Sequence, residues 1–125
     1  MFFKSADKTL AGKKPKKGAD AELRAQQILK AKGLRPLAQN FSVRGGELDL
    51  VMLDGAHLVF VEVRYRNNSR FGSAAETVTP HKQDKLRLAA MHFIQQHAEH
   101  AERPMRFDVI ALGPDSEEWI QDAFA

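Results

Sequence analysis

Apolar and polar residues alternate along two neighbouring stretches of the chain, residues 47–53 and 57–65, which Asp54-Gly55 separates. A period of two is typical of β-strands. Asp-Gly between two such stretches is a strong signal for a tight hairpin. The pattern therefore predicts an antiparallel hairpin with one apolar face that belongs to the core. The predicted core row is Leu48, Leu50, Met52, Val59, Val61 and Val63.

Helical spacing of apolar residues occurs on both sides of this hairpin. It predicts a first helix that begins at Ala19 or Asp20 and continues to about residue 32, where Gly33 suits a left-handed cap. Thr79-Pro80 predicts the start of a second helix, because threonine caps helices and proline fits the first helical position. This helix runs to about residue 98. Its predicted buried residues are Leu86, Ala89, Ala90, Phe93 and Ile94.

The remaining segments complete one α/β domain over residues 18–125. Residues 34–43 read as a strand that Pro36 weakens near its start, and Arg44-Gly45-Gly46 reads as a turn. Residues 105–112 predict a fourth strand, and residues 119–124 predict a short fifth. The polar segment 67–79 is long enough to indicate either disorder or a binding role.

Composition narrows the class of protein. The chain of 125 residues is 43% apolar, which is enough for one core, and it contains no cysteine. Disulfides and thiolate metal sites are therefore excluded, and a reducing cytoplasm is the expected location. The N-terminus lacks the long apolar stretch of a signal peptide or a membrane span, so no membrane partner is expected.

Positive charge is concentrated before Gly18, although the formal net charge is only +3. Residues 1–17 have little to bury and are predicted to form a flexible basic arm. Such an arm either contacts phosphates or only maintains solubility. Its lysines are Lys4, Lys8, Lys13, Lys14, Lys16 and Lys17.

The predicted hairpin gathers acidic residues on one face. A two-residue turn places Glu47 opposite Glu62, and a four-residue loop places Asp49 opposite Glu62. In both registers the three carboxylates and Arg64 share that face. Directly opposed like charges destabilise a strand pair, whereas Mg²⁺ favours one or two carboxylates together with water and phosphate oxygens.

Two interpretations of this acidic face remain open. It is either a metal site or the solvated face of a hairpin on which Arg64 balances the acids. Val51, Leu58 and Phe60 lie on the same face, which indicates that the acids are half-buried beside apolar residues.

Several segments resemble one protein family. "GELDLV" followed by "LVFVEVRYR" resembles the Asp…Glu-x-Lys signature of restriction-endonuclease-like nucleases. "GADAELRAQQILKAKGLRPLAQN", "TPHKQDKLRLAA", "MRFDVIAL" and the terminal "DAF" are similar to segments of the YraN family. That family consists of uncharacterised restriction-endonuclease-like proteins similar to archaeal Holliday-junction resolvases. The resemblance covers roughly residues 18–124. It implies a helix, a three-stranded antiparallel meander, a second helix and a further strand, with a central mixed sheet flanked by helices.

The resemblance also implies roles for individual residues. Asp49 and Glu62 match the metal-binding carboxylates, the Val63 carbonyl matches a further ligand, and Glu22 on the first helix matches the acid that completes the site. Glu47 either binds the metal or orients a neighbour. The implied cofactor is one or two Mg²⁺ or Mn²⁺ ions, which generate hydroxide for phosphodiester hydrolysis.

Arg64 departs from the signature, which more often has lysine at this position. Arginine keeps the positive charge and offers a planar fork to phosphate. It cannot act as a general base, because its pKa is too high for it to release a proton. We therefore expect Arg64 to bind the scissile phosphate.

Other positive residues fit a polyanionic partner, because phosphate contacts give affinity without reading sequence. The predicted nucleic-acid contacts are Arg44, Arg66, Arg70, Lys82, Lys85, Lys13, Lys14, Lys16 and Lys17. His97 and His100 show no zinc-site spacing and are predicted to be surface residues. A homodimer is a further expectation, since Trp119, Ile120 and Phe124 form either a dimer contact or part of the core.

Three functions are consistent with these features. The first is a metal-dependent endonuclease acting on structured or single-stranded DNA in recombination, repair or DNA uptake. The second is a catalytically weak or inactive nucleic-acid-binding module of the same fold, and the third is a structural partner-binding domain. Metal-dependent cleavage separates the first from the second, and salt-sensitive DNA binding separates both from the third.

Overall fold

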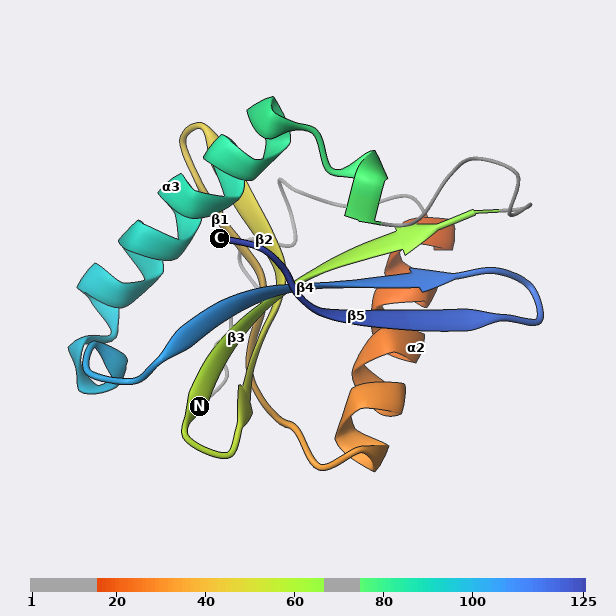
Figure 1. Cartoon of the computed structure of the whole chain (residues 1–125), viewed down its shortest axis with the longest axis horizontal. Coiled ribbons are helices and arrows are strands. Elements are labelled where there is room, and N and C mark those ends of the chain that lie inside the picture. Colours follow the sequence, from red (N-terminus) through yellow and green to blue (C-terminus); the bar gives the residue numbers. More distant parts are fainter. Residues whose placement is uncertain (1–15, 67–74) are drawn as a thin grey trace.

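Within the described residues, five strands form one mixed sheet in the order β1-β2-β3-β4-β5 (Figure 1). This computed structural model describes residues 16–66 and 75–125. β3 and β4 pair in parallel, whereas the other neighbours pair antiparallel. The predicted α/β class and mixed sheet are confirmed. The strands are β1 (Arg35–Val43), β2 (Gly46–Asp54), β3 (His57–Tyr65), β4 (Met105–Leu112) and β5 (Glu117–Phe124).

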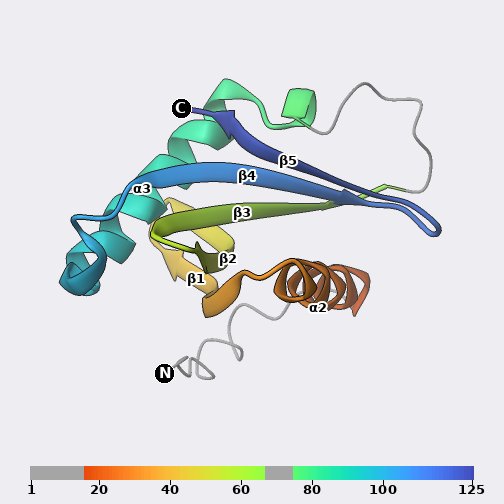
Figure 2. The ribbon, with the colours of Figure 1, turned by 60° about the horizontal axis from the view of Figure 1, so that its bottom comes forward.

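Two helices cover opposite faces of this sheet (Figure 2). α2 (Lys16–Ala31) buries Ala21, Ala25 and Leu29 against one face, and α3 (Pro80–Gln96) covers the other. α3 lies in the long crossover that a parallel β3–β4 pair requires. The short helices η1 (Ala75–Thr77) and η2 (Ala98–His100) precede and follow it.

Both predicted helix signals are confirmed in the structure. Gly33 has φ +101°, and the Leu34 N–H donates to the Leu29 carbonyl across the end of α2 at 3.0 Å. Thr79 caps α3, since its Oγ1 accepts from the Lys82 N–H at 3.2 Å. α2 begins earlier than expected, at Lys16. Lys13, Lys14, Arg70 and residues 67–74 lie outside the described residues, as do the side chains of Lys16 and Lys17.

The β2–β3 hairpin has the register in which Asp49 is aligned with Glu62. Leu50 pairs with Val61, and Asp54 pairs with His57 across a two-residue turn formed by Gly55 and Ala56. Of the two registers considered from the sequence, this is the one attributed to a longer loop. The actual turn is tight because it lies one residue further along the chain, with Gly55 at φ +61°.

One residue of the predicted core row lies on the other face. Leu50 and Met52 pack on the α2 side, but Leu48 packs on the α3 side with Val51. β2 therefore changes face between Leu48 and Leu50. β1 changes face at the matching place, because Ala38 and Phe41 both pack on the α3 side.

Asn40 lies in β1 between Ala38 and Phe41 and has φ +52°. A left-handed residue rotates the strand, so the simple two-residue alternation fails locally. Leu48 and Leu50 lie on opposite sides of the sheet, so simple alternation does not carry from Glu47 to Val51. The expectation that Glu47 shares a face with Glu62 and Arg64 stays a prediction.

Gly46 lies where α3 crosses β2. A Cβ atom at this position would overlap the Lys85 carbonyl and would press on the Ala89 side chain. We expect Gly46→Ala to destabilise the fold by about 1–3 kcal/mol, because two packed backbones must separate. Chemical denaturation measures this. Gly55→Asn is the control, since asparagine tolerates a positive φ; an equal loss in both variants would contradict the close-approach explanation.

A buried ion network joins β4 to β2 and β5. Asp108 is fully buried, and Arg106 donates to it through Nε at 3.0 Å and Nη2 at 3.2 Å. Trp119 Nε1 and the Asp122 N–H also donate to this carboxylate, each at 2.9 Å. Arg106 Nη2 reaches Asp54 Oδ2 at 2.8 Å. Both oxygens of the Asp108 carboxylate thus accept two hydrogen bonds each, and such satisfaction is the condition for burying a charge.

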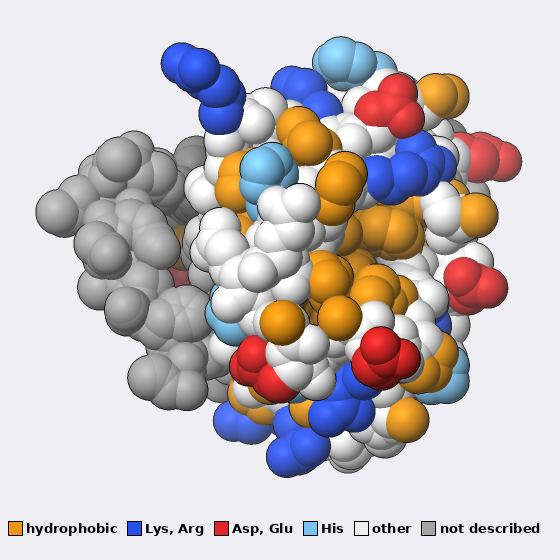
Figure 3. All heavy atoms as spheres, turned by 90° about the vertical axis from the view of Figure 1, so that its left-hand side faces the viewer, with side chains coloured by type: hydrophobic (Ala, Val, Ile, Leu, Met, Phe, Trp, Pro, Cys, Tyr) orange, Lys and Arg blue, Asp and Glu red, His pale blue; other side chains and the backbone are white. Residues whose placement is uncertain are grey.

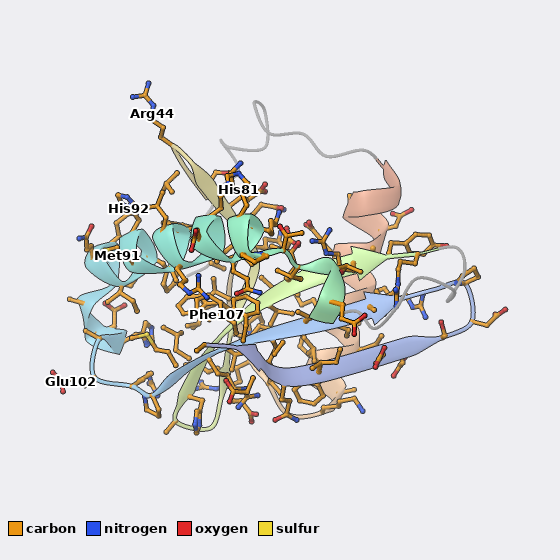
Figure 4. All side chains as sticks on the ribbon, turned by 45° about the horizontal axis from the view of Figure 1, so that its top comes forward. Arg44, His81, Met91, His92, Glu102 and Phe107 are labelled. Carbon is orange, nitrogen blue, oxygen red and sulfur yellow. The ribbon has the colours of Figure 1, made fainter. Side chains whose placement is uncertain are left out.

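The last strand contributes to the core. Ile120 and Phe124 pack against the α3-side cluster, and Trp119 packs against the α2-side cluster. Of the two roles considered for these residues, the structure shows the core role. Phe107, which lies beneath α3 in Figure 4, stacks on Phe124 with ring centroids 4.9 Å apart.

Some hydrophobic side chains remain exposed. Figure 3 shows hydrophobic side chains at the centre of one face of the molecule, with charged side chains around this patch. Met91 on α3 and Met105 on β4 are exposed large hydrophobic residues, as is Leu23 on α2. None of the helices within the described ranges is long and apolar enough to cross a membrane.

Candidate functional site

Asp49 lies where the β2–β3 ladder stops. The pairing extends to Leu50 and Val61, and the next aligned residues are Asp49 and Glu62. Beyond the ladder, the Val63 N–H donates to Asp49 Oδ2 at 2.9 Å. The carboxylate thus takes the place of a backbone partner and is held against β3. Asp49 is only 7% exposed.

Glu62 is buried next to Asp49. Its residue exposure is 5%, and its pKa rises from the usual 4.5 to about 7. Burial is the largest cause, followed by the charge of Asp49, while Lys82 and Arg64 lower the pKa. A side-chain hydrogen bond with Asp49 also raises it. Ionisation of Glu62 is therefore unfavourable beside the Asp49 carboxylate unless a cation compensates its charge.

The two carboxylate oxygens of Glu62 have different surroundings. Oε2 lies 3.5 Å from Arg64 Nε and 3.6 Å from Lys82 Nζ. Oε1 is buried and finds no hydrogen-bond partner among the described residues. A buried carboxylate oxygen without a donor is costly. A cation bound next to Glu62 Oε1 would supply the partner that this oxygen lacks among the described residues.

Arg64 is held from the side of α3. Its Nη2 donates to the Thr77 carbonyl in η1 at 3.1 Å. The side chain is 30% exposed, so the guanidinium lies between the buried acids and solvent. η1 therefore fixes the direction of Arg64, and the Glu62–Arg64 face points toward α3.

Lys82 joins the site from α3, at the third position of the helix. The sequence placed it among the general nucleic-acid contacts, whereas the structure brings its ammonium next to Glu62. The Thr79 cap fixes where the helix begins and hence where this side chain emerges. The Thr79-Pro80 cap was the sequence signal for where α3 begins. It could not show that this end of the helix lies next to β3.

The backbone of Val63 faces Asp49 at the edge of β3. Residues in an extended strand direct their N–H and C=O to the same edge, as the exchanged bonds of antiparallel pairs show. Since the Val63 N–H points to Asp49, its carbonyl faces the same side of β3.

The other two predicted acids lie on α2 and at the start of β2. Glu22 is buried on α2, 7% exposed, and Glu47 is half-buried on β2. No group of three or more His, Cys, Asp or Glu side chains within the described residues is arranged to hold a metal. The structure thus brings together Asp49, Glu62 and two cations, and the roles of Glu22 and Glu47 stay predictions.

The predicted phosphate contacts are spread over several elements. Arg44 projects from the β1–β2 turn away from the body of the protein (Figure 4). Lys85 is exposed on α3, and Arg66 is half-buried after β3. Of this set, Lys82 has an ion pair with Glu62.

The two histidines predicted to be surface residues are in fact half-buried. His97 stacks on Phe93 with centroids 4.0 Å apart, and its Nδ1 lies 2.9 Å from the Phe93 carbonyl. Arg103 Nε donates to His100 Nδ1 at 2.9 Å. These contacts show that His97 and His100 take part in the packing at the end of α3.

Comparison with known proteins gives a consistent assignment. Residues 21–112 match the model of a family described as uncharacterised protein family UPF0102. The chain belongs to the UPF0102 family. This is the YraN family that the sequence motifs indicated. The matched region includes Glu22, Asp49, Glu62 and Arg64.

Relatives in this family are similar to most of the chain. A UPF0102 protein of Aeromonas hydrophila is 50% identical over 111 residues, which cover 88% of this chain and 85% of the relative. One from Saccharophagus degradans is 49% identical over 107 residues, covering 86% and 91%. One from Alcanivorax borkumensis is 47% identical over 112 residues, covering 86% and 90%.

Proposed function

We propose that this UPF0102 protein is a metal-dependent endonuclease with a restriction-endonuclease-like core, which hydrolyses phosphodiester bonds in structured or single-stranded DNA. The observation that carries the proposal is the buried Asp49–Glu62 pair, in which Glu62 Oε1 has no described partner while cations contact Oε2. A role in DNA recombination, repair or uptake in the cytoplasm would follow from that activity.

The donor set fits Mg²⁺ or Mn²⁺. Both ions prefer oxygen ligands, and Mg²⁺ commonly uses one or two carboxylates together with phosphate oxygens and water. Asp49, Glu62 and the Val63 carbonyl would supply the protein oxygens. A bound ion would stabilise negative charge on the phosphate and activate water. It would also offset the burial and the charge of Asp49, which together raise the pKa of Glu62.

Arg64 has a separate part in this reaction. Its guanidinium lies beside Glu62 Oε2 and is oriented by the Thr77 carbonyl. From there it would donate hydrogen bonds to the scissile phosphate as charge grows during attack. The oxygen of water forms a bond to phosphorus and loses a proton to solvent, while the bond to the leaving oxygen breaks and that oxygen takes up a proton.

A cleavage assay tests the proposal. Junction, flap, single-stranded and duplex DNA are incubated with Mg²⁺ or Mn²⁺ and either the wild type or Asp49→Asn. Metal-dependent cleavage by the wild type, lost in Asp49→Asn, is the expected result. Salt-sensitive DNA binding without cleavage of any substrate would instead support the catalytically inactive binding module.

Substitutions at Arg64 distinguish catalysis from structural pairing. Arg64→Lys should keep or raise cleavage, since it restores the residue more usual in this signature. Arg64→Ala should lose about 10²–10³-fold, as when one transition-state donor is removed. Turnover and thermal unfolding are measured on the same preparations. A purely structural ion pair would instead lower the stability of Arg64→Ala and leave turnover per folded molecule unchanged.

A further inference from the structure

Lys82 comes to the acidic pair from a different element than the signature residues. Its Nζ is 3.6 Å from Glu62 Oε2, and its side chain is 39% exposed. The backbone beneath it is anchored, because the Lys82 N–H donates to Thr79 Oγ1 and Pro80 begins the helix. The Lys82 backbone is therefore fixed by the helix cap, while its flexible side chain lies between Glu62 and solvent.

The ion pair alone does not account for this placement. Partly exposed pairs contribute little to stability, about 0–1 kcal/mol. Arg64 already lies 3.5 Å from the same oxygen, so a second cation is redundant there. Meanwhile Oε1 of the same carboxylate finds no donor in the described part of the chain. The cations thus border Glu62 on one side only.

The summed charge of Asp49, Glu62, Arg64, Lys82 and a bound divalent cation favours an anionic ligand. With Asp49 and Glu62 ionised and a divalent cation bound, the ion and the four side chains carry a net charge of +2. A phosphodiester carries one negative charge, and attack by hydroxide brings the reacting group to two. Positive charge supplied by both Arg64 and Lys82 therefore matches the transition state better than the ground state, which is the condition for catalysis.

We propose that Lys82 is a catalytic residue, whose ammonium moves from Glu62 Oε2 to a non-bridging oxygen of the scissile phosphate. This inference rests on the proposed endonuclease function and adds a residue to it. Arg64 is tied to the Thr77 carbonyl and provides a fixed fork, whereas Lys82 provides a compact, mobile charge. The start of α3 thereby supplies a positive charge to the phosphate site that β2 and β3 alone would not provide.

The test compares Lys82→Ala, Lys82→Arg and the control Lys30→Ala. Lys30 is an exposed lysine in the last turn of α2. Single-turnover cleavage at saturating DNA should fall about 10²-fold in Lys82→Ala. Lys82→Arg should recover part of that loss, and Lys30→Ala should cleave as the wild type does. Melting temperatures of all three should stay close to that of the wild type, since a surface pair contributes little.

A second measurement uses inorganic phosphate as a probe. Calorimetric titration of phosphate into protein with Mn²⁺ should show weaker binding in Lys82→Ala, while the affinity for Mn²⁺ itself is retained. If Lys82→Ala cleaves DNA at the wild-type rate, or binds phosphate with wild-type affinity, Lys82 is not a catalytic residue. The endonuclease proposal itself would not be affected by that result. Absence of cleavage by the wild type would overturn the endonuclease proposal and the catalytic role of Lys82 with it.

Discussion

Glu62→Gln is expected to abolish metal-dependent cleavage, by about 10³-fold or more, while making the metal-free protein more stable. Cleavage falls because one of two carboxylates is lost, which exceeds the effect of removing one hydrogen-bond donor. Stability rises because the amide removes a buried charge from beside Asp49. The same substitution therefore has opposite effects on activity and folding, as expected where function requires unfavourable burial.

The pH dependence follows from the pKa of Glu62. Its pKa in the folded protein, about 7, is above the usual 4.5, so the folded state binds more protons between these values. Stability of the wild type should therefore fall as pH rises from about 4.5 to about 7, by roughly 2–3 kcal/mol. Glu62→Gln should lack this loss.

Unfolding curves at pH 5 and pH 8, with and without Mn²⁺, measure both effects. Mn²⁺ should raise the melting temperature of the wild type at pH 8 and should have little effect on Glu62→Gln. Equal stabilisation of both proteins by Mn²⁺ would show that Glu62 does not bind the ion.

Asp108→Ala is expected to produce the largest loss of stability, about 3–5 kcal/mol, because it leaves Arg106 charged and largely buried. Arg106 has 12% side-chain exposure, and Trp119 and the Asp122 N–H would lose their acceptor as well. Equilibrium denaturation gives the free energy of unfolding. Asp84→Ala is the control, because its pair with Arg87 is exposed and should cost little. Similar losses in the two variants would contradict the importance of burial.

Much of the fold followed from local patterns in the sequence. The alternation of residues 47–53 and 57–65 identified both strands, and Thr79-Pro80 and Gly33 identified helix ends. Asp49 and Glu62 were placed together because a period of two leaves few registers. These features depend on neighbours in sequence or on one tight turn, and so they can be inferred without tertiary structure.

Other features depend on contacts between distant segments. Leu48 packs on the α3 side, against the alternation of β2, and Asn40 of the neighbouring strand has a positive φ that no glycine marked. Lys82 reaches Glu62 only because the crossover brings α3 over the sheet. Asp54 and Asp108 meet through Arg106, which joins strands separated by the whole of α3. Local propensity does not specify such arrangements.

The parallel pairing of β3 and β4 has a consequence for the order of folding. β1, β2 and β3 are joined by short turns, whereas Phe60 pairs with Phe107 across the entire crossover. Short-range contacts form faster than long-range ones, so we expect the meander to form before α3 and β4 dock. Before α3 docks, Asp49 and Glu62 are adjacent but the Lys82 ammonium does not yet lie next to Glu62. Refolding should therefore be faster in mildly acidic solution, where a proton on the carboxylate pair reduces its repulsion in the absence of Lys82.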